Sequence, residues 1–240
     1  MKVVVISRGR HTRLKTLEWY KSAVVVCPES ELNDYKKVCN AVAIPDDCVG
    51  ISKTRNAVMR MFNKKEDDCV LMLDDDLLSI RTFMNVVFKL NEAECNVLFE
   101  NLQDCAENAG ARLFGLNNRF DPRVVRRNAP FAVHQWLGNV IGVIGTEVKW
   151  DENLKFKCDC DCVLRELLHR RIIWQDARYS FECDRDKAYG GNSKWRSQGE
   201  IEKEKAYLKQ KWGCWIEFGK YKSQEKVNLC VVRNQKIDLQ

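Results

Sequence analysis

Three consecutive aspartates, Asp74, Asp75 and Asp76, directly follow an apolar run over residues 69–73. A run that is apolar at consecutive positions predicts a strand buried on both faces, as in a parallel sheet covered by helices. Adjacent carboxylates at the end of such a strand repel one another and weaken the fold unless a cation compensates their charge. Asp74 and Asp76 point to the same side of an extended chain, and their oxygen ligands suit Mg²⁺ or Mn²⁺. The aspartates therefore predict an α/β sheet with a metal site at one edge; a solvated acidic turn is the alternative.

The first half of the chain alternates strand patterns with helix patterns. The expected strands are residues 3–7, 23–27, 42–45 and 69–73, and the expected helices are 12–21, 31–40 and a segment capped by Ser52. This alternation is typical of a parallel sheet that binds nucleotides at the carboxyl ends of its strands. We therefore expect the acidic edge to belong to a nucleotide site.

The second half loses this alternation. A helix over residues 92–108 and a strand over 112–116 precede a polar, basic segment over 117–130. Residues 131–145 and 150–156 then have strand patterns with no helix between them, which predicts a mixed sheet. Further expected elements are a helix around residues 163–168, a strand over 172–174 and a charged helix over 200–211.

Composition bears on the compartment and the partners. Most of the twelve cysteines lie in apolar segments, where free cysteine behaves as a small hydrophobe, so we expect a reduced, cytoplasmic protein. The spacing of Cys158, Cys160 and Cys162 matches no usual zinc pattern, although a structural zinc completed by Cys183 or Cys214 is an alternative. No apolar run approaches the roughly 20 residues of a membrane span, so we expect no membrane partner. The net charge of +6 permits an anionic partner without requiring one.

Three motifs, in this order, resemble the donor half of GT-A glycosyltransferases: Val-Val-Ile-Ser-Arg-Gly-Arg at 4–10, Ile-Ser-Lys-Thr-Arg-Asn at 51–56 and Leu-Met-Leu-Asp-Asp-Asp at 71–76. The resemblance implies an α/β GT-A fold, with a Rossmann-like nucleotide-binding half and a mixed central sheet. It implies one domain over residues 1–240, in which 1–116 bind a nucleotide sugar and 117–240 bind the acceptor. The expected donor is a UDP-sugar.

Site residues follow from the same resemblance. In the family, the first loop and the Arg-Asn helix start contact the nucleoside and phosphates, and an Asp-x-Asp motif holds the metal and ribose. The expected donor-binding residues are Ser7, Arg8, Arg10, Arg55, Asn56, Asp74 and Asp75, and the expected metal ligands are Asp74 and Asp76. Many members use a late histidine as a further ligand, but no histidine follows His169 here. Asp184, Asp186 or water is expected in its place.

A finer resemblance concerns phage glycosyltransferases found beside TET-type oxygenases, to which sugar addition on 5-hydroxymethylcytosine in DNA is assigned. It is carried by the opening Ile-Ser-Arg-Gly-Arg and by Gly-Gly-Asn-Ser-Lys-Trp-Arg at 190–196. Lys194 and Arg196 are expected to close over the pyrophosphate, with an ordinary turn as the alternative. Double-stranded DNA is expected on a basic surface with Trp195 stacking at a flipped pyrimidine, and the arginines of this surface are Arg119, Arg123, Arg126 and Arg127. A solubilising loop over a glycan or small-molecule acceptor is the alternative.

Two aspartates are candidates for the catalytic base. Asp159 and Asp161 lie in Cys-Asp-Cys-Asp-Cys, which resembles the segment where an acidic residue of the family opens a helix beside the acceptor. Asp159 is the favoured base and Asp161 its competitor, since Asp161 could instead cap the helix. Retaining members of the family need no base.

Two functions from other classes share parts of this pattern. A sugar-nucleotide nucleotidyltransferase would have an early glycine-rich loop with a lysine, whereas residues 7–12 contain one glycine. A catalytically silent nucleic-acid-binding domain would tolerate loss of the aspartates, and all three are present. Both are therefore less favoured than sugar transfer.

Overall fold

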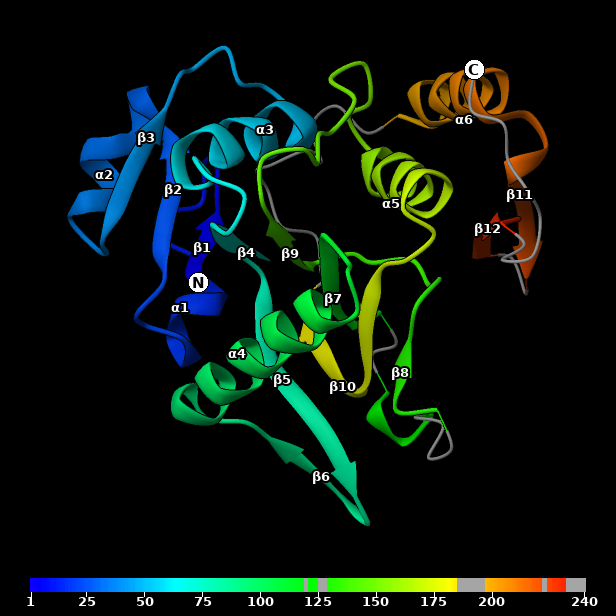
Figure 1. Cartoon of the computed structure of the whole chain (residues 1–240). Coiled ribbons are helices and arrows are strands. Elements are labelled where there is room, and N and C mark those ends of the chain that lie inside the picture. Colours follow the sequence, from blue (N-terminus) through cyan, green and yellow to red (C-terminus); the bar gives the residue numbers. More distant parts are fainter. Residues whose placement is uncertain (119–120, 125–128, 185–196, 222–223, 232–240) are drawn as a thin grey trace.

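A mixed β-sheet runs through the centre of the molecule, with helices on both of its faces (Figure 1). The computed structural model describes residues 1–118, 121–124, 129–184, 197–221 and 224–231. Within these residues the sheet has ten strands, in the order β3-β2-β1-β4-β9-β7-β10-β5-β6, with β8 paired to β10. The strands are β1 (Lys2–Ile6), β2 (Val24–Pro28), β3 (Ala41–Ile44), β4 (Cys69–Asp74), β5 (Leu77–Met84), β6 (Val86–Lys89), β7 (Leu113–Asn117), β8 (Phe131–Ala132), β9 (Val140–Ile144) and β10 (Trp174–Cys183).

Strands β1 to β4 form the parallel part of the sheet and confirm the four strands expected in this half. β1 is central in it, since Val4 lies opposite Val24 of β2 and Met72 of β4. The connecting helices are α1 (Lys15–Trp19), the 3-10 turn η1 (Glu29–Glu31) with α2 (Leu32–Lys36), and α3 (Ile51–Phe62). α1 and α2 are shorter than the sequence patterns predicted. The carboxyl ends of β1 and β4 lie side by side, which brings the first loop next to the three aspartates.

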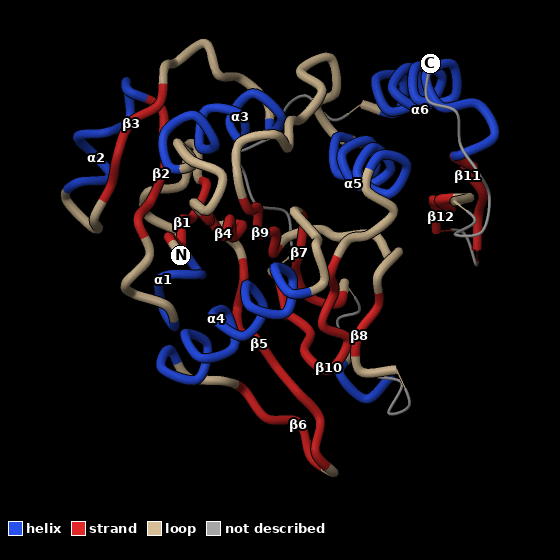
Figure 2. The backbone as a smooth tube through the Cα atoms, viewed as in Figure 1, coloured by secondary structure: helices blue, strands red, loops and turns tan. Residues whose placement is uncertain are grey.

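Two apolar clusters cover the two faces of the sheet. Val4 and Met72 belong to one cluster, with α3, α5 (Cys158–His169) and α6 (Gln198–Trp212), while Val5 and Leu71 belong to the other, with α4 (Glu92–Asn108). Figure 2 shows these helices on opposite sides of the strands. Because successive side chains of a strand point to opposite faces, strands buried on both faces need consecutive apolar residues, which is the pattern seen in the sequence.

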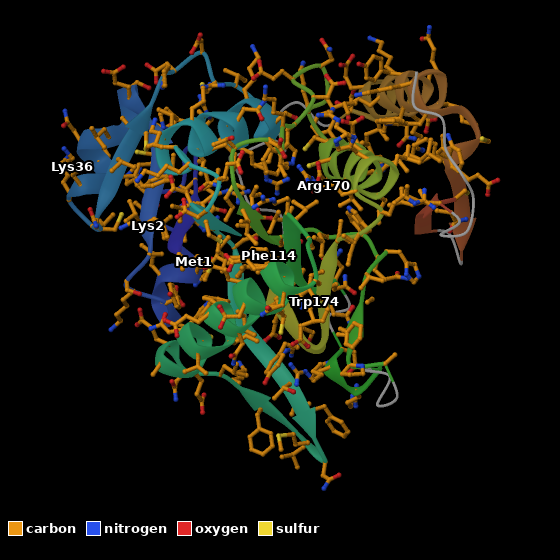
Figure 3. All side chains as sticks on the ribbon, in the orientation of Figure 1. Met1, Lys2, Lys36, Phe114, Arg170 and Trp174 are labelled. Atoms are coloured by element: carbon orange, nitrogen blue, oxygen red, sulfur yellow. The ribbon has the colours of Figure 1, made fainter. Side chains whose placement is uncertain are left out.

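Strand β9 makes the sheet mixed, because it runs antiparallel to β4 on one side and to β7 on the other. Its Gly142 faces the ring of Phe114, which is fully buried near the centre of the molecule (Figure 3). A Cβ at Gly142 would lie 2.1 Å from Cζ of Phe114. A side chain at position 142 would therefore have to displace the buried ring of Phe114.

Two strand predictions for the second half were wrong. Residues 131–145 do not form one strand, because β8 pairs with β10 whereas β9 pairs with β4 and β7. Residues 150–156 form a loop whose backbone is bonded by side chains of other segments, among them Asn56 and Glu204. The strand predicted over residues 172–174 overlaps β10 only at Trp174, where β10 begins.

The hairpin of β5 and β6 was not predicted. It follows the three aspartates directly and turns at Asn85, which has φ 71°. Asparagine tolerates this left-handed conformation better than most residues. Beyond α6, a 3-10 turn η4 (Gly213–Trp215) leads to a separate hairpin of β11 (Ile216–Tyr221) and β12 (Gln224–Leu229). None of the helices in the described residues is both long and apolar enough to cross a membrane.

Candidate functional site

A pocket of about 250 Å³ opens at the carboxyl ends of β1 and β4. Its walls come from four segments: the loop after β1, the start of α3, the three aspartates, and the loop that leads into α5. The lining residues are Ile6, Ser7, Arg8, Arg10, Val49, Gly50, Ile51, Thr54, Arg55, Asp74, Asp75, Asp76, Lys155, Phe156 and Asp159. The structure thus brings eight of the predicted site residues together, although they are spread from position 7 to position 159.

Asp75 orders the first loop. Its Oδ2 accepts a hydrogen bond from Ser7 Oγ at 2.5 Å, and its Oδ1 accepts one from Arg10 Nη1 at 2.7 Å. The hydroxyl of the fully buried Tyr35 lies 2.8 Å from Ser7 Oγ and accepts the backbone N–H of Arg10. The middle aspartate therefore holds Ser7 and Arg10 at the pocket, and this ion pair offsets its charge.

Asp74 is the last residue of β4 and is anchored at two points. Its Oδ2 accepts a hydrogen bond from Asn139 Nδ2 at 2.7 Å, and its carbonyl accepts one from the hydroxyl of Thr16 in α1 at 2.6 Å. Burial raises the pKa of Asp74 to about 7, and the neighbouring carboxylates of Asp76 and Asp75 add to this shift against the opposing charge of Arg55. The ionised form is therefore poorly compensated by the protein alone.

Asp76 has an unsatisfied oxygen. Its Oδ1 is buried without a hydrogen-bond partner among the described residues. Burial raises the pKa of this carboxyl to about 6, and the charge of Asp75 adds to the effect. The backbone N–H of Asp184 donates to the carbonyl of Asp76 at 2.8 Å, which places Asp184 close by.

These observations fit a divalent cation. A buried carboxylate oxygen without a partner, beside a second carboxylate with a raised pKa, is a favourable ligand for a hard cation. In the part of the chain that the structure describes, no group of three or more His, Cys, Asp or Glu side chains is arranged to hold a metal. A cation bound here by Asp74 and Asp76 would therefore take its other ligands from water and a phosphate-containing substrate, as Mg²⁺ commonly does.

The pocket lining also includes the ion pair of Arg55 and Asp159. Arg55 comes from α3, its side chain is 3% exposed, and its guanidinium lies 5.6 Å from the ring centroid of Trp150. Asp159 lies in the first turn of α5 and its side chain is 20% exposed. The carboxylate of Asp159 is thus held by a buried cation and still reaches the pocket.

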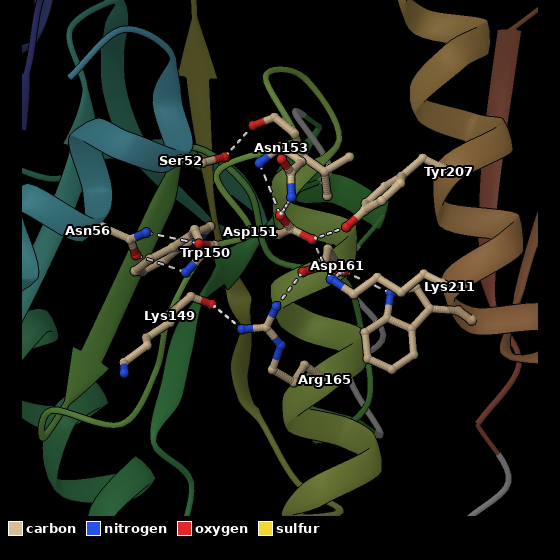
Figure 4. A network of polar contacts seen from close by, with 12 residues as sticks. Ser52, Asn56, Lys149, Trp150, Asp151, Asn153, Asp161, Arg165, Tyr207 and Lys211 are labelled. Atoms are coloured by element: carbon tan, nitrogen blue, oxygen red, sulfur yellow. Dashed lines mark hydrogen bonds and ion pairs between the residues drawn. The ribbon is translucent and has the colours of Figure 1, made fainter. Parts of the chain in front are cut away.

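Asp161 lies away from the pocket, in the polar network that joins α5 to α6 (Figure 4). Its side chain is fully buried, and Oδ2 accepts a hydrogen bond from Arg165 Nη2 at 2.8 Å. Oδ1 accepts Trp212 Nε1 at 2.8 Å and pairs with Lys211 Nζ at 2.7 Å. Lys211 also pairs with Asp151 at 2.6 Å. These contacts hold the Asp161 side chain in this network. Of the two candidate bases, Asp159 lines the described pocket and Asp161 does not.

We predict that Asp161→Asn lowers the free energy of unfolding by about 1–3 kcal/mol, because its NH₂ group replaces one of two buried oxygens that accept from Trp212 and Arg165. Turnover per folded molecule should stay within about twofold of the wild type, because the side chain does not reach the pocket. Urea unfolding and initial transfer rates check both parts. A large loss of turnover at unchanged stability would restore Asp161 as a candidate base.

Asn56 and Arg8 differ in what they present to the pocket. Asn56 Nδ2 donates to the carbonyl of Trp150 and its Oδ1 accepts the N–H of Trp150, both at 2.9 Å. It is absent from the described pocket lining, so its observed contacts fix the loop around Trp150. Arg8 lines the pocket, and one of its Nη atoms donates to the carbonyl of Cys48 at 3.1 Å.

The predicted acceptor surface lies largely outside the described residues. This applies to Arg119, Arg126, Arg127 and Trp195, and also to the predicted donor-loop residues Lys194 and Arg196. Arg123 is described and exposed, and its Nε and Nη2 donate to the carboxylate of Asp121 at 2.8–3.1 Å. Asp121 thus offsets the charge of Arg123, which weakens it as a phosphate contact.

Sequence reasoning missed Lys155 and Phe156. Both line the pocket from the loop before α5, next to Asp159. Lys155 lies four residues before the favoured base, Asp159, and could have been predicted to bind phosphate. It was not considered, because residues 150–156 were predicted to form a strand. Lys155 adds a fourth cationic side chain to Arg8, Arg10 and Arg55.

The fold and this pocket define an α/β protein with carboxylates and cations at the carboxyl ends of parallel strands, which is where sheets of this class bind nucleotides. Residues 1–190 match the model of the family described as TET-Associated Glycosyltransferase, so the chain belongs to that glycosyltransferase family. No curated protein matches the chain by sequence. Among solved structures, it resembles the crystal structure of residues 1–349 of S. aureus TarS, with 16% sequence identity and a TM-score of 0.43 over 79% of this chain and 59% of that chain.

The family match confirms the resemblance to TET-associated glycosyltransferases that was read in part from the motifs of the first 76 residues. Residues 191–196 lie beyond the matched range and outside the described residues. The mixed central sheet, with β1 to β4 parallel, agrees with the predicted GT-A architecture. The metal, the donor nucleotide, the acceptor and the roles of the site residues stay predictions.

Proposed function

We propose that this chain transfers a sugar from a nucleotide sugar, with a UDP-sugar as the expected donor, to the hydroxyl group of 5-hydroxymethylcytosine in DNA. The donor part rests on one observation: four aspartates, three of them consecutive, and four cationic side chains line the same pocket. A diphosphate bridged to a divalent cation needs ligands of both kinds. The acceptor part is supported by the TET-associated description of the family.

Each side chain has a proposed task at the donor. Asp74 and Asp76 would hold Mn²⁺ or Mg²⁺, which when bound would neutralise charge on the diphosphate leaving group. Arg8 and Lys155, which also line the pocket, would bind phosphate oxygens. Arg10 is paired with Asp75, and Arg55 is paired with Asp159. Their remaining N–H groups would donate hydrogen bonds to the phosphates, while the carboxylates compensate their positive charge. Ser7 would bind the nucleoside or keep Asp75 in position through their hydrogen bond.

Asp159 is the proposed base. The acceptor hydroxyl oxygen attacks the anomeric carbon and forms a new C–O bond, while its proton passes to the carboxylate of Asp159. The bond from the anomeric carbon to the diphosphate oxygen breaks, and its electron pair leaves with the nucleoside diphosphate. Arg55 keeps the Asp159 carboxylate oriented toward the pocket through their ion pair. This route inverts the anomeric configuration.

Nucleotide release from a panel of sugar nucleotides tests the proposal. UDP-, GDP-, ADP- and CDP-sugars are incubated with the protein and Mn²⁺, with and without a duplex that contains 5-hydroxymethylcytosine. We expect release that depends on one donor class, on the modified duplex and on the metal. Transfer to a glycan or small molecule, with none to the modified duplex, would overturn the DNA acceptor and leave the donor site standing.

We predict that Arg126→Ala with Arg127→Ala weakens transfer to DNA, and that transfer by the unchanged protein falls steeply with salt. Each lost phosphate contact reduces the slope of log activity against log salt by about 1. Arg123→Ala is the matched control, because Asp121 already binds that guanidinium, and its effect should be smaller. Steady-state rates on a hydroxymethylated duplex across a salt series decide this. Activity independent of salt would contradict a DNA surface.

A further inference from the structure

The loop of residues 155–157, which contributes Lys155 and Phe156 to the pocket lining, is bound by the carboxylate of Glu204 in α6. Glu204 Oε1 accepts the backbone N–H of Lys155 at 2.6 Å and of Phe156 at 3.2 Å. Its Oε2 accepts the N–H of Phe156 at 3.0 Å and of Lys157 at 2.9 Å. Glu204 is 8% exposed. Successive backbone N–H groups that converge on one anion form a nest, which fixes the backbone that donates them.

One of these contacts reaches the start of α5, at its N-cap residue Lys157. The helix begins at Cys158, and its N-cap residue Lys157 has no side-chain capping hydrogen bond. A helix start leaves backbone N–H groups without partners and favours a negative charge nearby. Glu204 supplies that charge from a position 47 residues away from Lys157. It therefore orients the turn in which Asp159 lies.

Three pocket residues depend on this arrangement. Lys155 and Phe156 belong to the loop that Glu204 binds, and Asp159 belongs to the helix turn that follows it. Glu204 itself does not line the described pocket. α6 also lies beyond residues 1–190, which are the part of the chain that the family model matches.

We propose that Glu204 is the positioning residue for this wall of the donor pocket: it holds the backbone of residues 155–157 so that Lys155 reaches the phosphates and Asp159 reaches the acceptor hydroxyl. This inference rests on the proposed function for its effect on binding and transfer. Its effect on the loop is independent of that function. The two parts can therefore be tested separately.

Glu204→Gln is the test variant, because it keeps the side-chain volume and replaces one accepting oxygen with an NH₂ group that cannot accept. The matched control is Glu202→Gln, since Glu202 lies on the same helix and its carboxylate accepts Gln198 and Lys205 on the surface. Hydrogen exchange of the amides of residues 155–157 is measured in both variants without ligand. We expect exchange at least about tenfold faster in Glu204→Gln and unchanged in the control.

Binding of UDP and of inorganic pyrophosphate, each with Mn²⁺, and steady-state transfer give the second readout. We expect Glu204→Gln to raise the Kd and the donor KM about tenfold and to lower kcat/KM by about 10- to 100-fold, because misplacement by about 1 Å is costly at a reacting centre. A merely structural role would lower the unfolding temperature and leave the KM of the folded fraction unchanged, which would overturn the inference.

The outcomes separate the two proposals. If the unchanged protein binds neither probe and transfers no sugar, the proposed function fails, while the exchange data still decide whether Glu204 holds the wall. If the amides of residues 155–157 exchange alike in Glu204→Gln and Glu202→Gln, the positioning role is wrong even where transfer is observed.

Discussion

Asp76→Asn is expected to abolish sugar transfer, with a loss of roughly 10³-fold or more, because a metal ligand contributes several kcal/mol of transition-state stabilisation. Asp76 has a buried oxygen without a partner in the described structure, and the substitution replaces one ligand oxygen by an amide nitrogen. The rate with saturating donor and Mn²⁺ measures the loss, and excess EDTA should reproduce it in the unchanged protein. Full activity in either experiment would contradict the metal assignment.

The unfolding temperature of Asp76→Asn shows whether its loss of activity comes from the site or from unfolding of the protein. The pKa of Asp76 is raised from 3.8 to about 6 in the folded state, so its stabilising contribution is present below about pH 4 and is lost as the pH rises through 6. At pH 8 the ionised carboxylate therefore destabilises the metal-free protein, and Asp76→Asn should unfold at the same temperature or a higher one. Asp67→Asn, an exposed charge change at the other end of β4, is the control and should keep full activity.

Asp159→Asn is expected to lower kcat by about 10²- to 10⁴-fold, the usual contribution of a positioned general base. The donor KM should change little, since an asparagine of the same shape can still contact Arg55. Initial rates across donor concentrations separate the two constants. A raised donor KM with kcat retained would instead mean that Asp159 serves only to hold Arg55 at the phosphates. Full kcat and KM would indicate a mechanism without a base, as in retaining enzymes.

The folding of this variant has to be followed as well. Arg55 is buried, and removal of its charged partner is expected to cost about 3 kcal/mol of the free energy of unfolding. Rates are therefore expressed per folded molecule, with Asp161→Asn as a comparison that loses a buried ion pair outside the pocket. If both variants lose turnover in proportion to their loss of folded protein, the assignment of Asp159 as base is wrong.

The sequence alone predicted the parallel part of the fold and its acidic edge. Both depend on local patterns: consecutive apolar residues specify a strand buried on both faces, and β4 ends on carboxylates. The order of these strands was not predicted, because β4 follows β3 in the chain but pairs with β1. The family was also predicted from the sequence, because each motif is a short run of consecutive residues that can be recognised without the fold.

Only the tertiary structure showed which of the two candidate bases lines the pocket. Asp159 and Asp161 are two residues apart on α5, so their side chains point about 200° apart around the helix axis. Packing of α6 against α5 buries Asp161 beneath Trp212 and Lys211 and leaves Asp159 at the pocket. In the same way, Glu204 meets the loop before α5 from 47 or more residues away. No local pattern specifies such contacts, because they depend on how distant elements pack.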